Sequence, residues 1–299
     1  MPIIVASWLD MLKTAANLPY AVGAFSPRYT KMILPVLQAA VELHSPVIVQ
    51  ISEKELDRNR VVLSSFAKEF YRQAARLELK VPAALHLDHA KTPGLIRDVI
   101  ACNFMSVMID ASDQVYDENV RISREIADYS HERGVFVEAE LGCIGATDSA
   151  ETDNSADCFT DPMEAGRFIR DARPDALAVS VGTSHGLYNG RQPNIQYDLL
   201  REIYARTGLP LVLHGGSDTP AEKLARAVRE VSAGVAKVNI ATDLEQAMLR
   251  TLGRKEHLTD SEVDALPPEK LELARLAVKE VVMDKMSNYL FSTGKAAPA

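Results

Sequence analysis

The chain has 299 residues, of which 47% are hydrophobic and 25% are charged, as is ordinary for a soluble globular protein of one large domain or two medium ones. The formal net charge of −8 argues against a nucleic-acid binder, which would carry a basic surface, but allows a local pocket for a phosphorylated metabolite. Three widely spaced cysteines, no signal-peptide pattern and no apolar run near the ~20 residues of a membrane helix predict a cytoplasmic protein without membrane partners.

Eight short apolar runs, mostly of Val, Ile and Leu, are typical of strands buried on both faces. They lie at residues 20–25, 46–51, 83–87, 106–110, 136–141, 176–182, 209–213 and 236–240. Helical patterns include residues 2–18, 30–43, 58–77, 118–133, 162–172, 221–231 and 243–252, and two more trail within 260–272 and 273–289.

Eight strand–helix units over roughly 240 residues predict an α/β fold, a TIM (β/α)8 barrel with additional C-terminal helices. A doubly wound sheet is the alternative, although such a sheet does not usually need eight evenly spaced units. No linker or low-complexity tract divides the chain, so we expect residues 1–299 to form a single domain.

Three of the predicted strands run into a histidine at the carboxyl end: His89, His185 and His214. In parallel α/β proteins this end of the strands is where ligands bind. Neutral imidazoles suit zinc, and three protein ligands leave a coordination position open for a substrate. The recurrence therefore predicts a catalytic zinc site, whereas any one histidine alone is more often structural.

Acidic residues accompany these histidines. Asp88 is interpreted either as a proton carrier beside the metal-bound substrate or as a carboxylate that orients a ligand histidine. His86 shares the barrel face of Asp88 one layer deeper and is expected to be a buried supporting residue. Glu138 and Glu140 also share one face, which predicts that they lie near the metal or form a salt bridge with a lysine such as Lys237.

Glycine and small polar residues follow the seventh and eighth strands, at 215–217 and 239–242. The loops after these two strands form the usual phosphate site of a TIM barrel, where backbone N–H groups bind the anion. The segment 142–160, after the fifth strand, is long and polar, which indicates a functional loop or a disordered one.

The segments 86–89, 137–142, 182–188, 211–217 and 237–243 resemble the class II fructose-bisphosphate aldolase family. The similarity runs in order from about residue 20 to residue 285, and 214–220 and 279–282 are most similar to the tagatose-bisphosphate branch. The resemblance implies a zinc-dependent aldolase that cleaves a ketose 1,6-bisphosphate, of fructose or tagatose type, to dihydroxyacetone phosphate and glyceraldehyde 3-phosphate. Family members often also bind a monovalent cation, Na⁺ or K⁺, beside the phosphate.

The resemblance also implies roles for individual residues. Zinc ligands would be His89, His185 and His214, with Glu140 near the metal and Asp88 as the catalytic acid/base. The expected substrate-binding residues are Ser52, Gly186, Gly215, Gly216, Ser217, Asn239, Ile240, Ala241 and Thr242. In a homo-oligomer, dimer or tetramer, Arg275 would reach the substrate phosphate of a neighbouring subunit.

Three positions depart from the family pattern. Residues 26–28 read Ser-Pro-Arg where the family usually has Asn after the first strand. The loop after the fifth strand carries Asp148 in place of the usual glutamate. This loop is expected to close as a lid, and either Asp148 or Glu151 is expected to protonate the enediolate. Arg191 stands near the usual position of a lysine. These departures leave two alternatives: the same mechanism on another phosphorylated ketose, or a non-catalytic subunit that retains the barrel.

Overall fold

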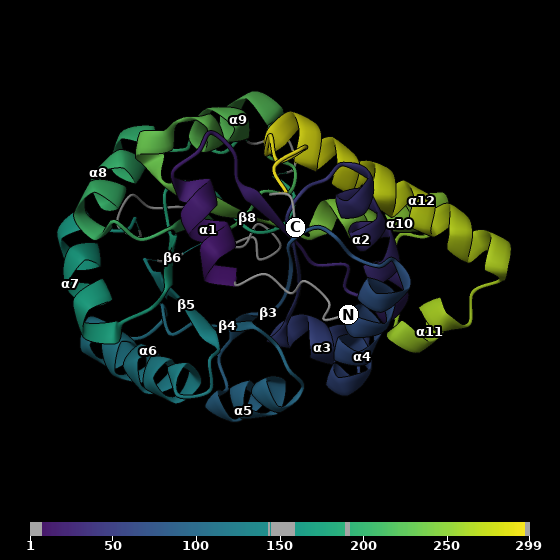
Figure 1. Cartoon of the computed structure of the whole chain (residues 1–299), viewed down its shortest axis with the longest axis horizontal. Helices are drawn as coiled ribbons and strands as arrows, with labels where there is room; N and C mark the ends of the chain where they lie inside the picture. The colour runs from purple at the N-terminus through teal and green to yellow at the C-terminus, as the bar shows by residue number, and fades with distance from the viewer. Residues whose placement is uncertain (1–7, 143, 145–158, 189–191, 297–299) are drawn as a thin grey trace.

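Eight parallel strands close into a barrel in which each strand pairs with the next and the last pairs with the first, so the predicted TIM barrel is confirmed (Figure 1). The computed structural model describes residues 8–142, 144, 159–188 and 192–296. The strands are β1 Val22–Phe25, β2 Val47–Ser52, β3 Ala83–Ala90, β4 Ser106–Ile109, β5 Phe136–Leu141, β6 Ala176–Val179, β7 Leu211–Leu213 and β8 Val235–Ile240.

Helices surround the barrel, and each strand is followed by at least one of them before the next strand begins. They are α2 Ile33–Glu42, α3 Glu53–Asn59, α4 Leu63–Arg76, α5 Pro93–Ala101, α6 Tyr116–His131, α7 Pro162–Ala172, α8 Tyr197–Thr207, α9 Ala221–Arg229 and α10 Thr242–Thr251. The chain then adds α11 Asp260–Asp264 and the long α12 Pro268–Asp284, which packs against α10 and α2 at the edge of the molecule (Figure 1).

The first helix, α1 Trp8–Ala16, packs against β8 and β1 and closes the amino end of the barrel. Its Trp8 is fully buried and stacks on His86 and Phe136, with ring centroids 5.9 and 6.1 Å apart. Small inward side chains of the strands form one hydrophobic cluster with α1, while a larger cluster fills the space between the strands and the outer helices. Ligands therefore have access at the carboxyl end of the strands, as is usual for this fold.

Two predicted helix boundaries are wrong. The pattern at 58–77 is two helices, because Arg60 adopts a left-handed conformation with φ of 53° and ends α3 before α4 begins. Helix α3 begins immediately after β2, where the Ser52 side chain accepts the Glu55 N–H in a capping box. Near the C-terminus, the boundary between the trailing helices lies at Pro267 rather than at residue 272, since proline is favoured at a helix start.

The third strand is longer than predicted and contains both Asp88 and His89. Its pairing with β4 shifts register between Leu87 and Ala90, and His89 has a positive φ of 43°. An irregularity of this kind re-aims neighbouring side chains. It explains how two consecutive residues can both serve one site. Within the described residues, no helix has the length and apolarity to cross a membrane.

Candidate active site

A cavity of about 830 Å³ opens at the carboxyl end of the barrel, a size typical of a small-molecule site. Every strand end contributes to its lining: Ser26 after β1, Gln50 on β2, Asp88 on β3, Asp110 after β4, Glu140 on β5, His185 after β6, Gly215 after β7 and Asn239 on β8. The barrel therefore gathers into one site residues that lie more than two hundred positions apart.

The three predicted histidines lie together: His89 and His185 line this cavity, and His214 is fully buried beside them. The ring centroids of His89 and His214 are 4.4 Å apart, and those of His185 lie 4.8 Å from His89 and 5.4 Å from His214. His89 Nε2 is 2.6 Å from His214 Nδ1, and one nitrogen of each ring lies within 4.8 Å of the others. The described residues thus contain a three-imidazole cluster with the spacing of a metal site.

Two of these rings are each oriented by a carboxylate. Glu138 Oε1 lies 3.1 Å from His214 Nε2, and Asp110 Oδ2 lies 3.0 Å from His89 Nδ1. Because a carboxylate accepts hydrogen bonds, these contacts place the ring protons on the outer nitrogens and direct His214 Nδ1 and His89 Nε2 to the centre. Glu138 also accepts a hydrogen bond of 2.8 Å from Lys237, so the predicted salt bridge forms as well.

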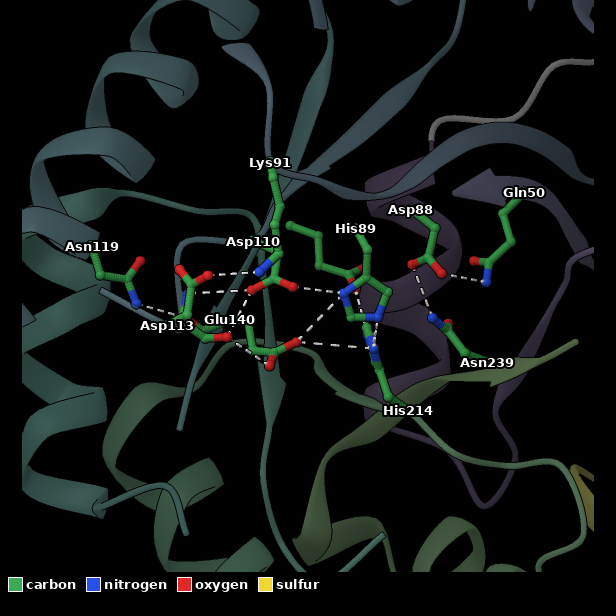
Figure 2. Close-up of polar contacts among 12 residues, drawn as sticks. Gln50, Asp88, His89, Lys91, Asp110, Asp113, Asn119, Glu140, His214 and Asn239 are labelled. Carbon is green, nitrogen blue, oxygen red and sulfur yellow. Dashed lines mark hydrogen bonds and ion pairs between the residues drawn. The ribbon is translucent and has the colours of Figure 1, made fainter. Parts of the chain in front are cut away.

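Glu140 lies between these groups, as Figure 2 shows. Its Oε2 is 3.9 Å from His89 Nδ1 and 4.0 Å from His214 Nδ1, and among the described residues this buried oxygen accepts no hydrogen bond. Burial and the nearby charge of Asp110 raise the pKa of Glu140 to about 8. A buried carboxylate oxygen that lacks a donor and lies about 4 Å from two imidazoles fits a bound cation.

The charges around the histidines favour positive charge at this position. Burial lowers the pKa of His89, but Asp88, Asp110 and Glu140 outweigh it and raise that pKa to about 10. Burial and the charge of His89 keep the pKa values of His185 and His214 well below the usual range. The carboxylates therefore favour a cation at this position, and His185 and His214 are in the neutral form that binds a metal.

Asp88 has different partners from the carboxylates that orient the rings. It accepts hydrogen bonds from Gln50 Nε2 at 3.1 Å and from Asn239 Nδ2 at 3.0 Å (Figure 2). Two amides thus hold the carboxylate at the cavity wall beside the histidine cluster. Of the two interpretations of Asp88, this geometry favours the proton carrier, because Asp110 and Glu138 already occupy the orienting positions.

The loops after β6, β7 and β8 form another part of the wall. Gly186, Gly215, Ser217, Asn239, Ala241 and Thr242 line the cavity, whereas Gly216 and Ile240 are not among its lining residues. Ser217 Oγ accepts the Ala241 N–H at 3.1 Å, and α10 begins at Thr242. Gly215 has φ of 70°, and a side chain there would lie 2.2 Å from the carbonyl oxygen of Ser184. Only glycine allows this close approach of the two loops.

The remaining predicted residues have different positions. Ser52 lines the cavity as the N-cap of α3. Arg275 lies on α12, where its Nε donates to the carbonyl oxygen of Lys31 at 3.2 Å, and it is not among the lining residues of its own chain's cavity. Asp148, Glu151 and Arg191 lie outside the described residues.

Sequence reasoning missed the roles of Asp110 and Gln50, and it predicted Asn239 as a substrate-binding residue without its contact to Asp88. Asp110 ends a predicted strand in the same way as the histidines do, so its position was the available signal. Gln50 on β2 and Asn239 on β8 both donate hydrogen bonds to Asp88, and no local sequence pattern predicts these long-range contacts. The ion pairs of Arg28 with Glu55 and Glu245 were missed for the same reason.

Comparisons with known proteins agree with this arrangement. The family model described as "Fructose-bisphosphate aldolase class-II" matches residues 6–295. Proteins named fructose-bisphosphate aldolase from Staphylococcus epidermidis and Giardia intestinalis are each 33% identical, and the alignments cover 97% and 94% of this chain and 98% and 91% of those relatives.

Solved structures show the same likeness. The YdjI aldolase from Escherichia coli K12 is 29% identical with a TM-score of 0.82, and the match covers 98% of this chain and 99% of that one. A fructose-bisphosphate aldolase from Campylobacter jejuni has a TM-score of 0.72 over 94% of this chain and 92% of that one, and at 22% identity this likeness concerns the fold alone.

Proposed function

Because the chain belongs to the class II fructose-bisphosphate aldolase family and is an aldolase, we propose that it is zinc-dependent and reversibly cleaves a phosphorylated ketose to dihydroxyacetone phosphate and an aldehyde. The observation that carries the proposal is the cluster of three imidazoles beside the unsatisfied oxygen of Glu140. Such a donor set suits zinc with one open coordination position.

In this proposal His89, His185 and His214 would hold the zinc, and Glu140 would add negative charge beside it. Bound zinc supplies Lewis-acid polarisation of the substrate carbonyl and stabilises the negative charge that develops when the carbon–carbon bond breaks. Glu138 and Asp110 keep the ligand rings in their orientation through the hydrogen bonds described above.

The chain's own acid/base chemistry centres on Asp88. Held by Gln50 and Asn239, its carboxylate accepts the C4 hydroxyl proton while the C3–C4 bond breaks, and it returns that proton in the condensation direction. The loops after β6, β7 and β8 bind the phosphate at C1 through backbone N–H groups and the N-terminus of α10. These contacts orient C2 toward the histidine cluster.

The family resemblance suggests fructose or tagatose 1,6-bisphosphate as the ketose, with glyceraldehyde 3-phosphate as the second product. A different phosphorylated ketose is the second candidate, and the buried ion pairs of Arg28 at the cavity wall favour it. A Na⁺ or K⁺ ion beside the phosphate, a dimer or tetramer, a single domain over the whole chain and a cytoplasmic location stay predictions.

A panel of phosphorylated ketoses tests the proposed function. The zinc-loaded protein should release dihydroxyacetone phosphate from at least one of them, measured by enzymatic trapping of that product. Chelated protein should release none, and zinc should restore the release. The proposal would be contradicted if the zinc-loaded protein released no dihydroxyacetone phosphate from any ketose of the panel and also failed to exchange the C3 proton of added dihydroxyacetone phosphate with solvent.

The proton carrier for the enediolate is the subject of a first prediction. One of Asp148→Ala and Glu151→Ala should slow exchange of the dihydroxyacetone-phosphate C3 proton with deuterated solvent by roughly 10²-fold or more, the range of a positioned acid/base. The two variants serve as controls for each other, since both remove a carboxylate from one segment. Exchange at the wild-type rate in both would show that neither residue carries this proton.

A second prediction concerns Arg275. If a neighbouring subunit's Arg275 binds the substrate phosphate, Arg275→Ala should raise the Michaelis constant about tenfold, the loss of one charge-assisted hydrogen bond, with little change in kcat. The exposed Arg254 on the same C-terminal segment provides the matched variant Arg254→Ala. An unchanged Michaelis constant in Arg275→Ala would remove this residue from the site.

A further inference from the structure

The cavity has a wall that the phosphate and metal sites do not use. It consists of residues 26–28 after β1, helix α3, and the segments that follow β3 and β4. With the C1 phosphate at the loops after β6, β7 and β8, and with Asp88 at the C4 hydroxyl, the aldehyde half of the substrate must lie along this wall. Its charge therefore decides which aldehyde is accepted.

Arg28 is the buried cation of this wall, with 8% of its surface exposed. Its Nε donates to Glu55 Oε1 at 2.8 Å, its Nη1 contacts Glu245 Oε2, and its Nη2 donates to Thr242 Oγ1 at 3.3 Å. All three nitrogens thus have protein partners, two of which are carboxylates. Arg28 also has a φ of 62°, a conformation that only specific surroundings hold in a non-glycine residue.

The two carboxylates are themselves fixed. Glu245 also accepts hydrogen bonds from Tyr29 OH and His257 Nδ1, both at 2.8 Å. Glu55 accepts the Ser52 N–H at 3.0 Å in the capping box of α3. Turning Arg28 toward a ligand would leave these buried carboxylates without their cation, which is strongly unfavourable.

The other cations of this wall are balanced in number by carboxylates, although the buried Nη2 of Arg58 has no hydrogen-bond partner among the described residues. Lys91 pairs with Asp113 at 2.7 Å, Arg58 Nη2 lies 3.9 Å from Glu245, and Lys54 is exposed to solvent. Among the described lining residues of this wall, the basic residues Arg28, Lys54, Arg58 and Lys91 face an equal number of acidic residues, Glu53, Glu55, Asp57 and Asp113. Glu245 behind Arg28 makes the balance negative.

We propose that the aldehyde half of the cavity takes an uncharged, hydroxylated aldehyde, so that the preferred substrates are ketose 1-phosphates without a second phosphate. A phosphate dianion at this wall would meet a negative balance of charge and a buried arginine whose three nitrogens already have protein partners. Sugar hydroxyl groups, in contrast, both donate and accept, and paired charged side chains offer partners of both kinds. This inference rests on the proposed aldol cleavage and adds the class of the aldehyde.

The test compares two aldehydes that differ only in the phosphate. Zinc-loaded protein condenses dihydroxyacetone phosphate with D-glyceraldehyde or with D-glyceraldehyde 3-phosphate, and kcat/KM is measured for each. We expect the phosphorylated aldehyde to have no advantage. An advantage of hundredfold or more for glyceraldehyde 3-phosphate would overturn the inference.

Variants then test whether the ion pairs of Arg28 with Glu55 and Glu245 cause the lack of preference for the phosphorylated aldehyde. Glu55→Gln removes one of the two charges that neutralise Arg28 and keeps the capping geometry. The ratio of kcat/KM for glyceraldehyde 3-phosphate to kcat/KM for glyceraldehyde should therefore rise about tenfold. The matched control is Glu69→Gln, because Glu69 pairs with Arg72 on α4 outside the cavity, and it should leave the ratio unchanged. If the ratio shifts no more in Glu55→Gln than in Glu69→Gln, the ion pairs of Arg28 do not determine the choice of aldehyde.

A further variant covers the case in which Glu55→Gln does not fold. Asp113→Asn releases Lys91 at the exposed rim, so it should shift the ratio in the same direction by less than about fivefold, since solvent screens this pair. No shift in Asp113→Asn would contradict the inference.

Proton exchange of dihydroxyacetone phosphate alone needs no aldehyde, so it tests the proposed function separately from the choice of aldehyde. Normal exchange with a strong preference for glyceraldehyde 3-phosphate would overturn only this inference, whereas absent exchange would contradict the proposed function itself.

Discussion

His214→Ala should lose zinc on dialysis and lower turnover by roughly 10³-fold or more, because a Lewis-acid metal contributes several kcal/mol to the lowering of the barrier. His214 is fully buried, and its Nδ1 lies 2.6 Å from His89 Nε2 at the centre of the cluster. Its loss removes one of three ligand nitrogens. The partner carboxylate Glu138 keeps its 2.8 Å ion pair with Lys237, so the barrel should still fold.

The matched control is His131→Ala. His131 lies on the outside of α6 and pairs with Asp175 at 2.8 Å, far from the cavity lining. This variant should retain zinc and activity. Elemental analysis together with an assay of ketose cleavage measures both quantities. A His214→Ala protein that keeps its zinc through dialysis, or that cleaves the ketose at the wild-type rate, would show that the metal is held elsewhere.

Asp88→Ala should slow ketose cleavage by roughly 10²- to 10⁴-fold, the contribution of a positioned acid/base, while zinc stays bound. The hydrogen bonds of Asp88 among the described residues go to Gln50 and Asn239 and not to the three ligand histidines, so its removal should not release the metal. Asp88 acts on the C4 hydroxyl group. Solvent exchange of the dihydroxyacetone-phosphate proton, which does not involve C4, should therefore fall much less than cleavage does.

This difference between cleavage and exchange separates a chemical role from a structural one. The exposed Asp98 on α5 provides the control Asp98→Ala, which should change neither rate. If Asp88→Ala loses zinc, cleavage and exchange to the same extent, Asp88 supports the metal site rather than moving the proton.

Most of the fold followed from the sequence because apolar runs of Val, Ile and Leu recur at the spacing of strand–helix units. The metal cluster followed because His89, His185 and His214 stand at equivalent strand ends, and the barrel brings such positions together. The break of α3 at Arg60 was not predictable, since its left-handed conformation occurs without the glycine that usually marks such a position.

The electrostatics of the aldehyde wall could not be derived from local patterns. Arg28 and Glu245 are 217 positions apart, and neither lies in a motif that indicates a charge pair. Likewise, Gln50 contacts Asp88 from the neighbouring strand β2, whereas Asn239 contacts it from β8, which β1 and β2 separate from β3, so this contact depends on closure of the barrel. Pairings of this kind require the tertiary structure.

The most direct test of the proposed function is solvent exchange of dihydroxyacetone phosphate in deuterated water, followed by NMR with chelated protein and with the same protein after zinc is restored. This measurement needs neither the correct ketose nor the correct aldehyde. We expect exchange by the zinc-loaded protein, none above background by the chelated protein, and recovery in proportion to the zinc bound. Equal exchange by the chelated and zinc-loaded proteins, or no exchange by either, would contradict a zinc-dependent aldolase at this site.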